Sequence, residues 1–578
     1  MPPVYALALT LAVAGPLGAP GYLLLRDAVS TPRSYLSDAA LGLSEAAPRA
    51  LPQDFAVALA SSLLDGGVVV KTLLVAGLWA AGYGAARLVA AVLPDAGVAG
   101  QCVAATVAVW NPYVAERLLQ GHWSLLVGYG SLPWVAAAVL RLRGATPHRP
   151  PKWHSSSESA RGRLPECHFG GIGAVLFWVA LAGLTPTGLI LAALTALACA
   201  LAPGDGRPRW VCAALSLAAA LGAALPWLVA SAVATGWAEQ HGDLGTASFA
   251  ARAEPGLGTL GSLASLGGIW NAEAVPASRT TLFAIASAVV LLGVVAAGVP
   301  TLIRRRTAVP LLVLAAVAVV VPALAATGPG LAAVEAVVRA APGLGVVRDG
   351  QKWVALAMPA YALAGAAAVI ALRPRVPAVA TAAVCCAALV ATLPDLAWGV
   401  GGRLVPVHYP PGWQAAAATI NADPRPVAVL PVDSMRRFGW AGDAPVLDPL
   451  PRWVSADVLS TGDLVIAGRL IPGEGTRARE IQQMVVSGVD RDRLAEAGVG
   501  WVVVEGPQDR PPELPVAYRD ADIAVYAVGG DTPPSTHRTL LIAAHAVWLG
   551  QLGAGLAVML LGLRRRRVHS PQSSGDTR

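Results

Sequence analysis

The sequence predicts an α-helical polytopic membrane protein of about twelve spans that carries a C-terminal extracytoplasmic α/β domain. The chain is 55% hydrophobic and only 13% charged, with a mean hydropathy of +0.58, whereas about 25% of a typical globular domain is charged. Apolar runs close to the roughly 20 residues that a bilayer-spanning helix needs recur along the chain. A different pattern, short apolar strands alternating with helical stretches, occupies residues 397–538.

The apolar runs predict twelve transmembrane helices. They fall near residues 4–25, 68–93, 97–115, 123–141, 170–185, 187–202, 210–233, 281–302, 308–326, 353–372, 376–396 and 539–563. The pair at 170–202 is split by the segment GLTPTG at 183–188, which we interpret as a tight turn between two short helices. Asn111-Pro112 should end the third span, because proline disfavours helix at the preceding residue.

Arginine placement sets the expected orientation. Five clusters follow apolar runs, at residues 141–163, 207–209, 304–306, 373–375 and 564–567. With twelve spans and the N-terminus inside, all five lie on the cytoplasmic side, as the positive-inside rule requires, whereas eleven spans would place some outside. The first run has no basic residue before it, so we interpret it as an uncleaved helix. The protein is expected in the cell membrane with both termini cytoplasmic.

This topology divides the chain into four parts. Residues 1–396 form the multispan membrane domain, 397–538 the exposed α/β domain, 539–563 the last helix and 564–578 a basic, disordered tail. The outer loops of the membrane domain are 26–67, 113–122, 234–280 and 327–352.

The exposed domain shows its α/β character locally. VAVL at 427–430 and WVVV at 501–504 predict strands, residues 413–420 and 477–486 predict helices, and DRLAEAGV at 492–499 predicts a helix stopped by glycine before a strand. No GxGxxG or P-loop pattern favours nucleotide binding.

Composition excludes several function classes. The net charge of +7 comes largely from arginines beside apolar runs, so no nucleic-acid partner is expected. Five of the six cysteines lie in apolar stretches and Cys167 in a basic loop, so no disulfide framework is implied. A divalent metal is possible at the carboxylates, although no ligand spacing calls for one. Only three residues are lysine, which suggests a high-GC genome such as that of an actinomycete.

Three outer segments carry a family resemblance. They are LRD at 25–27 with PRALPQD at 48–54, WNPYVAERLLQGHW at 110–123, and VRDGQKW at 347–353. Together with the multispan layout over about 400 residues, they resemble the GT-C glycosyltransferases, in particular actinobacterial cell-wall arabinofuranosyltransferase-like proteins. The carbohydrate-binding modules of the largest relatives are absent, which leaves the acceptor open.

The resemblance implies a catalytic carboxylate in the long first outer loop and a sugar donor carried on a polyprenyl phosphate. Asp27, at the outer end of the first span, is the first choice for the base that takes the acceptor proton, followed by Asp54 and Asp38. The alternative is that Asp27 merely marks a helix end. Asp65 precedes two glycines and is expected to be a turn residue.

Basic residues near the outer surface are candidates for binding the lipid phosphate. Lys71 and Lys352 lie at outer helix ends, and Arg348 precedes Lys352 by four residues, which on a helix places both on one face. Such cations could stabilise the charge that develops on the leaving group. Long basic chains also reach toward lipid headgroups without any catalytic role, and for Lys71 this alternative is favoured.

The short loop at 113–122 holds further candidates. Glu116 and Arg117 are neighbours, a pattern typical of a solvated ion pair, and His122 could bind a sugar hydroxyl or a phosphate or be structural. Residues 331–341 predict an amphipathic helix on the membrane, and 234–280 either a flap over the substrate or a linker. The exposed-domain tryptophans 413, 440, 453 and 501 could stack on sugars, although core packing is favoured.

The leading hypothesis is a polyprenyl-phosphate-sugar-dependent glycosyltransferase on the outer face, acting in cell-envelope glycan or lipoglycan assembly. Its expected partners are a lipid-linked sugar donor, an envelope glycan acceptor and membrane lipid, and the exposed domain could also bind a protein partner. A transporter or flippase for an envelope lipid is the alternative, although the spans are nearly free of charge away from their ends and no internal repeat is visible. A third possibility is a non-catalytic scaffold.

Overall fold

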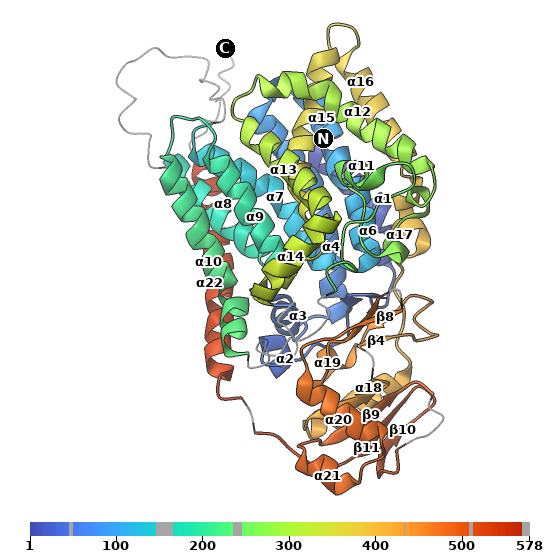
Figure 1. Ribbon diagram of the computed structural model, residues 1–578. Helices are drawn as coiled ribbons and strands as arrows, with labels where there is room; N and C mark the ends of the chain where they lie inside the picture. Colours follow the sequence, from blue (N-terminus) through green and yellow to red (C-terminus); the bar gives the residue numbers. More distant parts are fainter. Residues whose placement is uncertain are drawn as a thin grey trace, which may run out of the picture.

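The structure is a computed structural model, and it describes residues 1–44, 50–145, 166–234, 245–340, 342–432, 434–466, 468–507, 512–533 and 535–568. A helical bundle fills most of the molecule, and a smaller domain built on a sheet lies below it in Figure 1. Most of the predicted tail at 564–578 falls outside the described residues.

Six described helical segments are long and apolar enough to cross a membrane. They are α4 (Gly66–Val92), α7 (Trp123–Leu142), α10 (Arg209–Val233), α12 (Phe283–Ile303), the segment Gly350–Leu372 and residues Arg538–Gly562 of α22. Two bent pairs raise the count to eight: α13 (Val309–Ala325) with α14 (Gly328–Ala340), bent by 96°, and α16 (Ala378–Ala391) with Pro394–Gly402, bent by 75°. The segment Gly350–Leu372 comprises the 3₁₀ helix η7 (Gly350–Ala357) and α15 (Met358–Leu372).

The structure therefore does not confirm twelve spans, because several expected ones are too short. The first ends early: α1 (Pro2–Ala14) passes into a 3₁₀ turn at Gly15–Gly18, and its 13 residues rise only about 20 Å. The third is divided into α5 (Gly97–Val109) and α6 (Pro112–Gln120) at Asn111, as the Asn-Pro pair predicted. The tight turn predicted at 183–188 is confirmed, because α8 (Glu166–Ala182) and α9 (Pro186–Ala200) meet there.

The exposed domain confirms the predicted strands and helices. Its five-stranded sheet has the order β10-β11-β9-β3-β6. Strand β3 (Val427–Leu430) runs parallel to β6 (Val458–Leu459) and β9 (Trp501–Glu505), whereas β11 (Ile523–Ala527) and β10 (Val516–Arg519) continue it antiparallel.

Helices flank this sheet. They are α18 (Pro411–Ala422), α20 (Thr476–Val486) and α21 (Arg491–Glu496), and the last stops before Gly498 at φ +84°. Trp413, Trp453 and Trp501 are buried in the core of this domain, and Trp440 is half-buried against it. This burial favours core packing over stacking on sugars.

The loop interpreted as either a flap or a linker packs against the bundle where it is described. Residues 235–244 lie outside the described residues. Residues 245–280 pack along the bundle and include α11 (Gly258–Ala264). Arg279 and Glu254 form a fully buried ion pair within this segment. The described part is therefore anchored to the bundle by buried side chains, although residues such as Leu260 remain exposed.

Helix α12 packs closely on α15 through small residues, and this contact can be tested. A Cβ atom at Gly298 would lie 1.8 Å from the carbonyl oxygen of Ala364, whereas one at Gly293, on the same helix, would meet nothing within 4 Å. We expect Gly298→Ala to destabilise the protein by about 1–3 kcal/mol through overpacking. Gly293→Ala should be neutral or stabilise it by up to about 1 kcal/mol. Thermal unfolding in nanodiscs measures both, and equal effects would contradict this packing.

Candidate functional site

The segment that follows the turn at Gly15–Gly18 forms a short hairpin that carries Asp27. Strands β1 (Leu24–Leu25) and β2 (Ala28–Val29) pair antiparallel, and Arg26 between them adopts φ +50°. The Asp27 backbone N–H donates to the carbonyl of Gln120 over 3.2 Å. A Cβ at Gly121, which has φ +84°, would lie 2.2 Å from the Ala28 nitrogen, so only glycine permits this approach.

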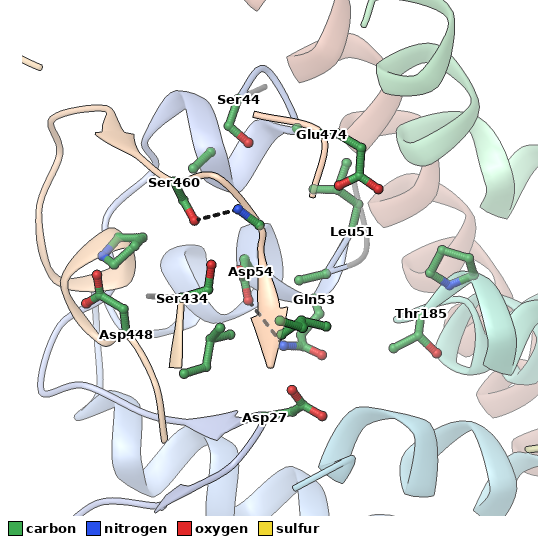
Figure 2. A pocket seen from close by; sticks show the side chains of 18 of the residues that line it. Asp27, Ser44, Leu51, Gln53, Asp54, Thr185, Ser434, Asp448, Ser460 and Glu474 are labelled. Atoms are coloured by element: carbon green, nitrogen blue, oxygen red, sulfur yellow. Dashed lines mark hydrogen bonds between the residues drawn. The ribbon is translucent and has the colours of Figure 1, made fainter. Parts of the chain in front are cut away.

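This approach places the Asp27 carboxylate between two side chains of the same turn. Its Oδ2 accepts a hydrogen bond from Gln120 Nε2 at 2.9 Å and lies 3.0 Å from His122 Nε2. Its Oδ1 accepts none from the described residues, and 40% of the side chain is exposed to a cavity. In Figure 2 the carboxylate points toward that cavity, below Gln53 and Asp54.

Arg117 determines which nitrogen of His122 carries the proton. Its NH1 lies 3.0 Å from His122 Nδ1, and a guanidinium can only donate hydrogen bonds. Nδ1 must therefore be the acceptor, so that Nε2 carries the hydrogen and donates it to Asp27. The histidine is held neutral in the one tautomer that supports an ionised Asp27.

Arg117 is itself held by a buried ion pair. It is fully buried, and its NH1 and NH2 donate to Asp349 Oδ2 and Oδ1 at 2.8 and 3.0 Å, a bidentate arrangement. Its NH2 also donates to Gln351 Oε1. Asn111 begins α6 by accepting from Val114 N–H at 3.1 Å, with Pro112 in the first turn, and thereby sets the direction of the helix that carries Arg117.

Glu116 is buried beside this pair but does not bind Arg117, so the solvated Glu-Arg pair predicted from the sequence is wrong. Its carboxyl accepts from Gly268 N–H at 3.2 Å, Ile269 N–H at 3.1 Å and Gln351 Nε2 at 3.0 Å. Burial, followed by the nearby charge of Glu254, raises the pKa of Glu116 well above its ordinary value. Glu116 therefore connects α6 to the 268–269 segment rather than facing a ligand.

Asp27, His122 and Asp349, which are connected through Arg117, all have shifted pKa values. Burial alone would raise the pKa of Asp27, but the hydrogen bond from His122, then the hydrogen bond from Gln120 and the charge of Lys352, lower it below its ordinary value. Burial lowers the pKa of His122 despite the opposing effect of Asp27. Although burial opposes it, the charges of Arg117 and Lys352 lower the pKa of Asp349 to about 2. At neutral pH both carboxylates are ionised and the imidazole is neutral.

Asp27 opens on a cavity of about 1770 Å³ between the helical bundle and the exposed domain. We name its walls by their residues. The bundle wall holds Asp27, Gln120, His122, Arg348 and Lys352; the apolar wall holds Ile190, Trp227, Leu228, Val338 and Leu344; the sheet wall holds Ser434, Asp448, Ser460 and Glu474. Figure 2 shows Asp27 and the sheet-wall residues around one space.

Two of the three cations predicted to bind a phosphate, Lys352 and Arg348, line this cavity, although not on a common α-helical face. Lys352 lies in η7, with Nζ 3.8 Å from Asp349 Oδ2. Arg348 precedes η7, donates to the carbonyl of Gly345 at 3.1 Å and stacks over the Phe249 ring at 5.1 Å. The bundle wall thus combines one carboxylate with two cationic side chains.

The other predicted residues fall into two groups. Asp38 and Asp54 line the cavity but are paired, Asp38 with Arg538 and Asp54 with Arg452 at 3.2 Å. Glu116, Arg117 and Lys71 are buried and do not line the cavity; Lys71 donates to the Ala19 carbonyl at 2.8 Å. Asp65 begins α4 by accepting from Val68 N–H at 3.1 Å, as expected of a turn residue.

Sequence reasoning missed Gln120, Asp349 and Gln351, which fix the positions of Asp27 and Arg117. All three lie inside the segments that carry the family resemblance, beside residues that were selected. The signal was present for Asp349, a carboxylate between two selected cations. No pattern pointed to the sheet wall, because its residues come from separate loops of the exposed domain.

No group of three or more His, Cys, Asp or Glu side chains that could hold a metal ion occurs within the described residues. Comparison of the chain with protein-family models, with curated proteins and with solved structures found no match.

Removal of the Asp349 charge should destabilise the whole protein. Asp349→Asn leaves Arg117 buried without its counter-charge, and breaking a buried pair in this way costs about 3–5 kcal/mol. The control is Glu335→Gln, which removes an exposed pair with Arg339 on α14 and should cost less than about 0.5 kcal/mol. Unfolding temperatures in nanodiscs compare the two, and a similar small loss for both would refute the role given to Asp349.

The neutral state of His122 predicts a pH dependence of stability. Because folding lowers the pKa of His122 from its ordinary 6.5, the unfolded chain binds this proton more readily. The stabilising contribution is complete above pH 6.5 and is lost as the pH falls through the lowered value. Asp349, with a pKa of about 2, stays ionised throughout this range.

The test compares unfolding temperatures at neutral pH and at about pH 5. His122→Gln retains an amide that can accept from Arg117 and donate to Asp27 but cannot titrate. We expect the wild-type protein to lose more stability on acidification than His122→Gln does. Identical losses would show that His122 is not held in the neutral form.

Proposed function

We propose that this protein is a membrane glycosyltransferase that uses a polyprenyl-phosphate-linked sugar as donor, in cell-envelope glycan or lipoglycan assembly on the outer membrane face. The single observation that carries the proposal is the cavity whose bundle wall holds the Asp27 carboxylate together with Lys352 and Arg348. An inverting transfer requires one base and positive charge for a leaving phosphate, and this wall holds both.

The apolar wall supports a lipid-linked donor. Trp227 and Leu228 come from near the end of α10, a candidate span, and Ile190 from α9, so a polyprenyl chain could lie against the wall while its phosphate reaches Lys352. Binding sites for small molecules typically combine such an apolar surface with a few polar groups that fix orientation.

In the proposed reaction, Asp27 takes the proton of the acceptor hydroxyl as its oxygen forms a bond to the anomeric carbon. The bond between that carbon and the phosphate oxygen breaks, and the phosphate leaves with the electron pair. The positive charges of Lys352 and Arg348 stabilise the developing phosphate charge. His122 and Gln120 hold Asp27 through Oδ2, which leaves Oδ1 for the acceptor proton. His122, Arg117 and Asp349 are positioning residues.

The finer membrane topology is part of the same proposal. Eight candidate spans, three shorter apolar helices (Pro2–Gly18, Gly170–Ala182 and Pro186–Ala200) and α5 would give twelve crossings. Twelve crossings with cytoplasmic termini place the arginine clusters inside and the cavity outside.

We expect Asp27→Asn to reduce sugar transfer from a polyprenyl-phosphate donor by about 10²–10⁴-fold, because a carboxamide cannot accept the acceptor proton. Donor affinity should change little, since the amide retains the size of the carboxyl group. Transfer of radiolabelled sugar by purified protein in nanodiscs, over a panel of donors and acceptors, provides the measurement.

Two aspartate variants serve as controls. Asp95→Asn removes an exposed acid that pairs with Arg305 away from the cavity, and it should leave transfer unchanged. Asp54→Asn removes a cavity carboxylate already paired with Arg452, and it should reduce transfer far less than Asp27→Asn. Full turnover by Asp27→Asn would move the base elsewhere. Lipid movement in proteoliposomes without any transfer would favour the flippase.

A further inference from the structure

The carboxyl ends of the parallel strands in the exposed domain form the edge of the sheet at which ligands most often bind. Strands β3, β6 and β9 are parallel, with β3 between the other two. From β3 the chain passes to β6 on one side, and from β6 it crosses to β9 on the other side. In open α/β sheets, ligands bind outside the carboxyl ends of the parallel strands.

These carboxyl ends open into the cavity that contains Asp27. Pro431 and Ser434 follow β3, and Ser460 and Gly462 follow β6; all four line the cavity. At the end of β9, Glu505 binds Arg436, whose side chain also reaches the cavity wall, at 2.6 Å. The carboxyl-end edge of the sheet and the bundle wall therefore face the same cavity (Figure 2).

Ser434 is an independent sign that this edge binds a ligand. The side chain is only 8% exposed, it lines the cavity, and its Oγ has no hydrogen-bond partner among the described residues. A buried hydroxyl without a partner costs about 1–3 kcal/mol. A ligand hydroxyl in the cavity would supply the missing partner.

The charges of the sheet wall indicate the class of ligand. Arg436 is held by Glu505 and by Asp448 at 3.5 Å, and Arg477 donates to the Ala497 carbonyl at 3.0 Å and to Thr532 at 3.1 Å. Arg452, which also lines the cavity, is paired with Asp54, and Arg437 donates to the Asp443 carbonyl at 2.8 Å. Beside these arginines the sheet wall contributes the hydroxyls of Ser434 and Ser460, the carboxylate of Glu474 and that of Asp448, which is shared with Arg436. Hydroxyls and carboxylates bind sugar hydroxyls well, whereas carboxylates repel a phosphate.

We propose that the carboxyl-end edge of β3 and β6, with Ser434 and Ser460, is a binding site for a neutral oligosaccharide. This binding site rests on the proposed function only for the role that it is given in catalysis. In glycosyl transfer it would hold the acceptor opposite the phosphate-binding cations, with one acceptor hydroxyl directed to Asp27. Oligosaccharide binding itself is independent of transfer.

The test measures binding first and transfer second, with the full chain in nanodiscs. The probes are fluorescently labelled neutral pentose and hexose oligosaccharides, with inorganic phosphate and sugar phosphates as anionic comparators. We expect a neutral oligosaccharide to bind, and Ser434→Ala to weaken it about three- to tenfold, as expected for one lost hydrogen bond.

Protein stability separates a ligand contact from a structural role. Removing an unpartnered buried hydroxyl should leave the unfolding temperature of Ser434→Ala unchanged or raise it. The matched control is Ser487→Ala at the end of α20, where an exposed hydroxyl donates to Met484, and it should affect neither binding nor transfer.

The outcomes distinguish this site from the proposed function. Binding of the oligosaccharide without transfer by the wild-type protein would support the site and refute the function. Transfer with an acceptor KM that Ser434→Ala leaves unchanged would support the function and refute the site. The proposed oligosaccharide site would also be overturned if no neutral oligosaccharide bound, or if Ser434→Ala weakened the binding of the anionic probes alone.

Discussion

The buried ion pair between Arg117 and Asp349 is the constraint on which the candidate site depends. It joins α6 to the turn before η7 across a sequence separation of 232 residues, with two hydrogen bonds of 2.8 and 3.0 Å. Desolvating two charges is expensive, and such pairs seldom add net stability over an apolar core. Its evident effect is geometric: a fixed guanidinium selects the His122 tautomer, and His122 with Gln120 fixes the Asp27 carboxylate.

The cavity beyond Asp27 is formed jointly by the bundle and the exposed domain. The bundle contributes Asp27, Lys352, Arg348 and the apolar wall, and the exposed domain contributes the hydroxyls and carboxylates of the sheet wall together with several arginines. The backbone of Arg26 ties the two parts together, because it donates to Pro445 over 2.9 Å and accepts from Leu447 over 2.9 Å. The residue next to Asp27 is therefore anchored to the exposed domain.

The sequence predicted local structure well and side-chain partners poorly. The turn at 183–188, the helix break at Asn111 and the strands at 427–430 and 501–504 follow from proline, capping residues and apolar periodicity, which act over a few residues. Helix lengths were overestimated where apolar residues continue past the end of a helix, as after Ala14. Among the site residues, Asp27 was selected from the family resemblance, and Lys352 and Arg348 by type and position. Whether a carboxylate is paired depends on contacts such as Asp38–Arg538 that no local pattern reveals.

A cryo-electron microscopy structure of the full chain in nanodiscs with a polyprenyl phosphate tests the central claim most directly. We predict that the phosphate lies within hydrogen-bonding distance of Lys352, that the prenyl chain lies along Trp227 and Leu228, and that Asp27 remains bound to His122 and Gln120. Phosphate bound away from Lys352, or a cavity filled by side chains with Asp27 turned from it, would contradict the account.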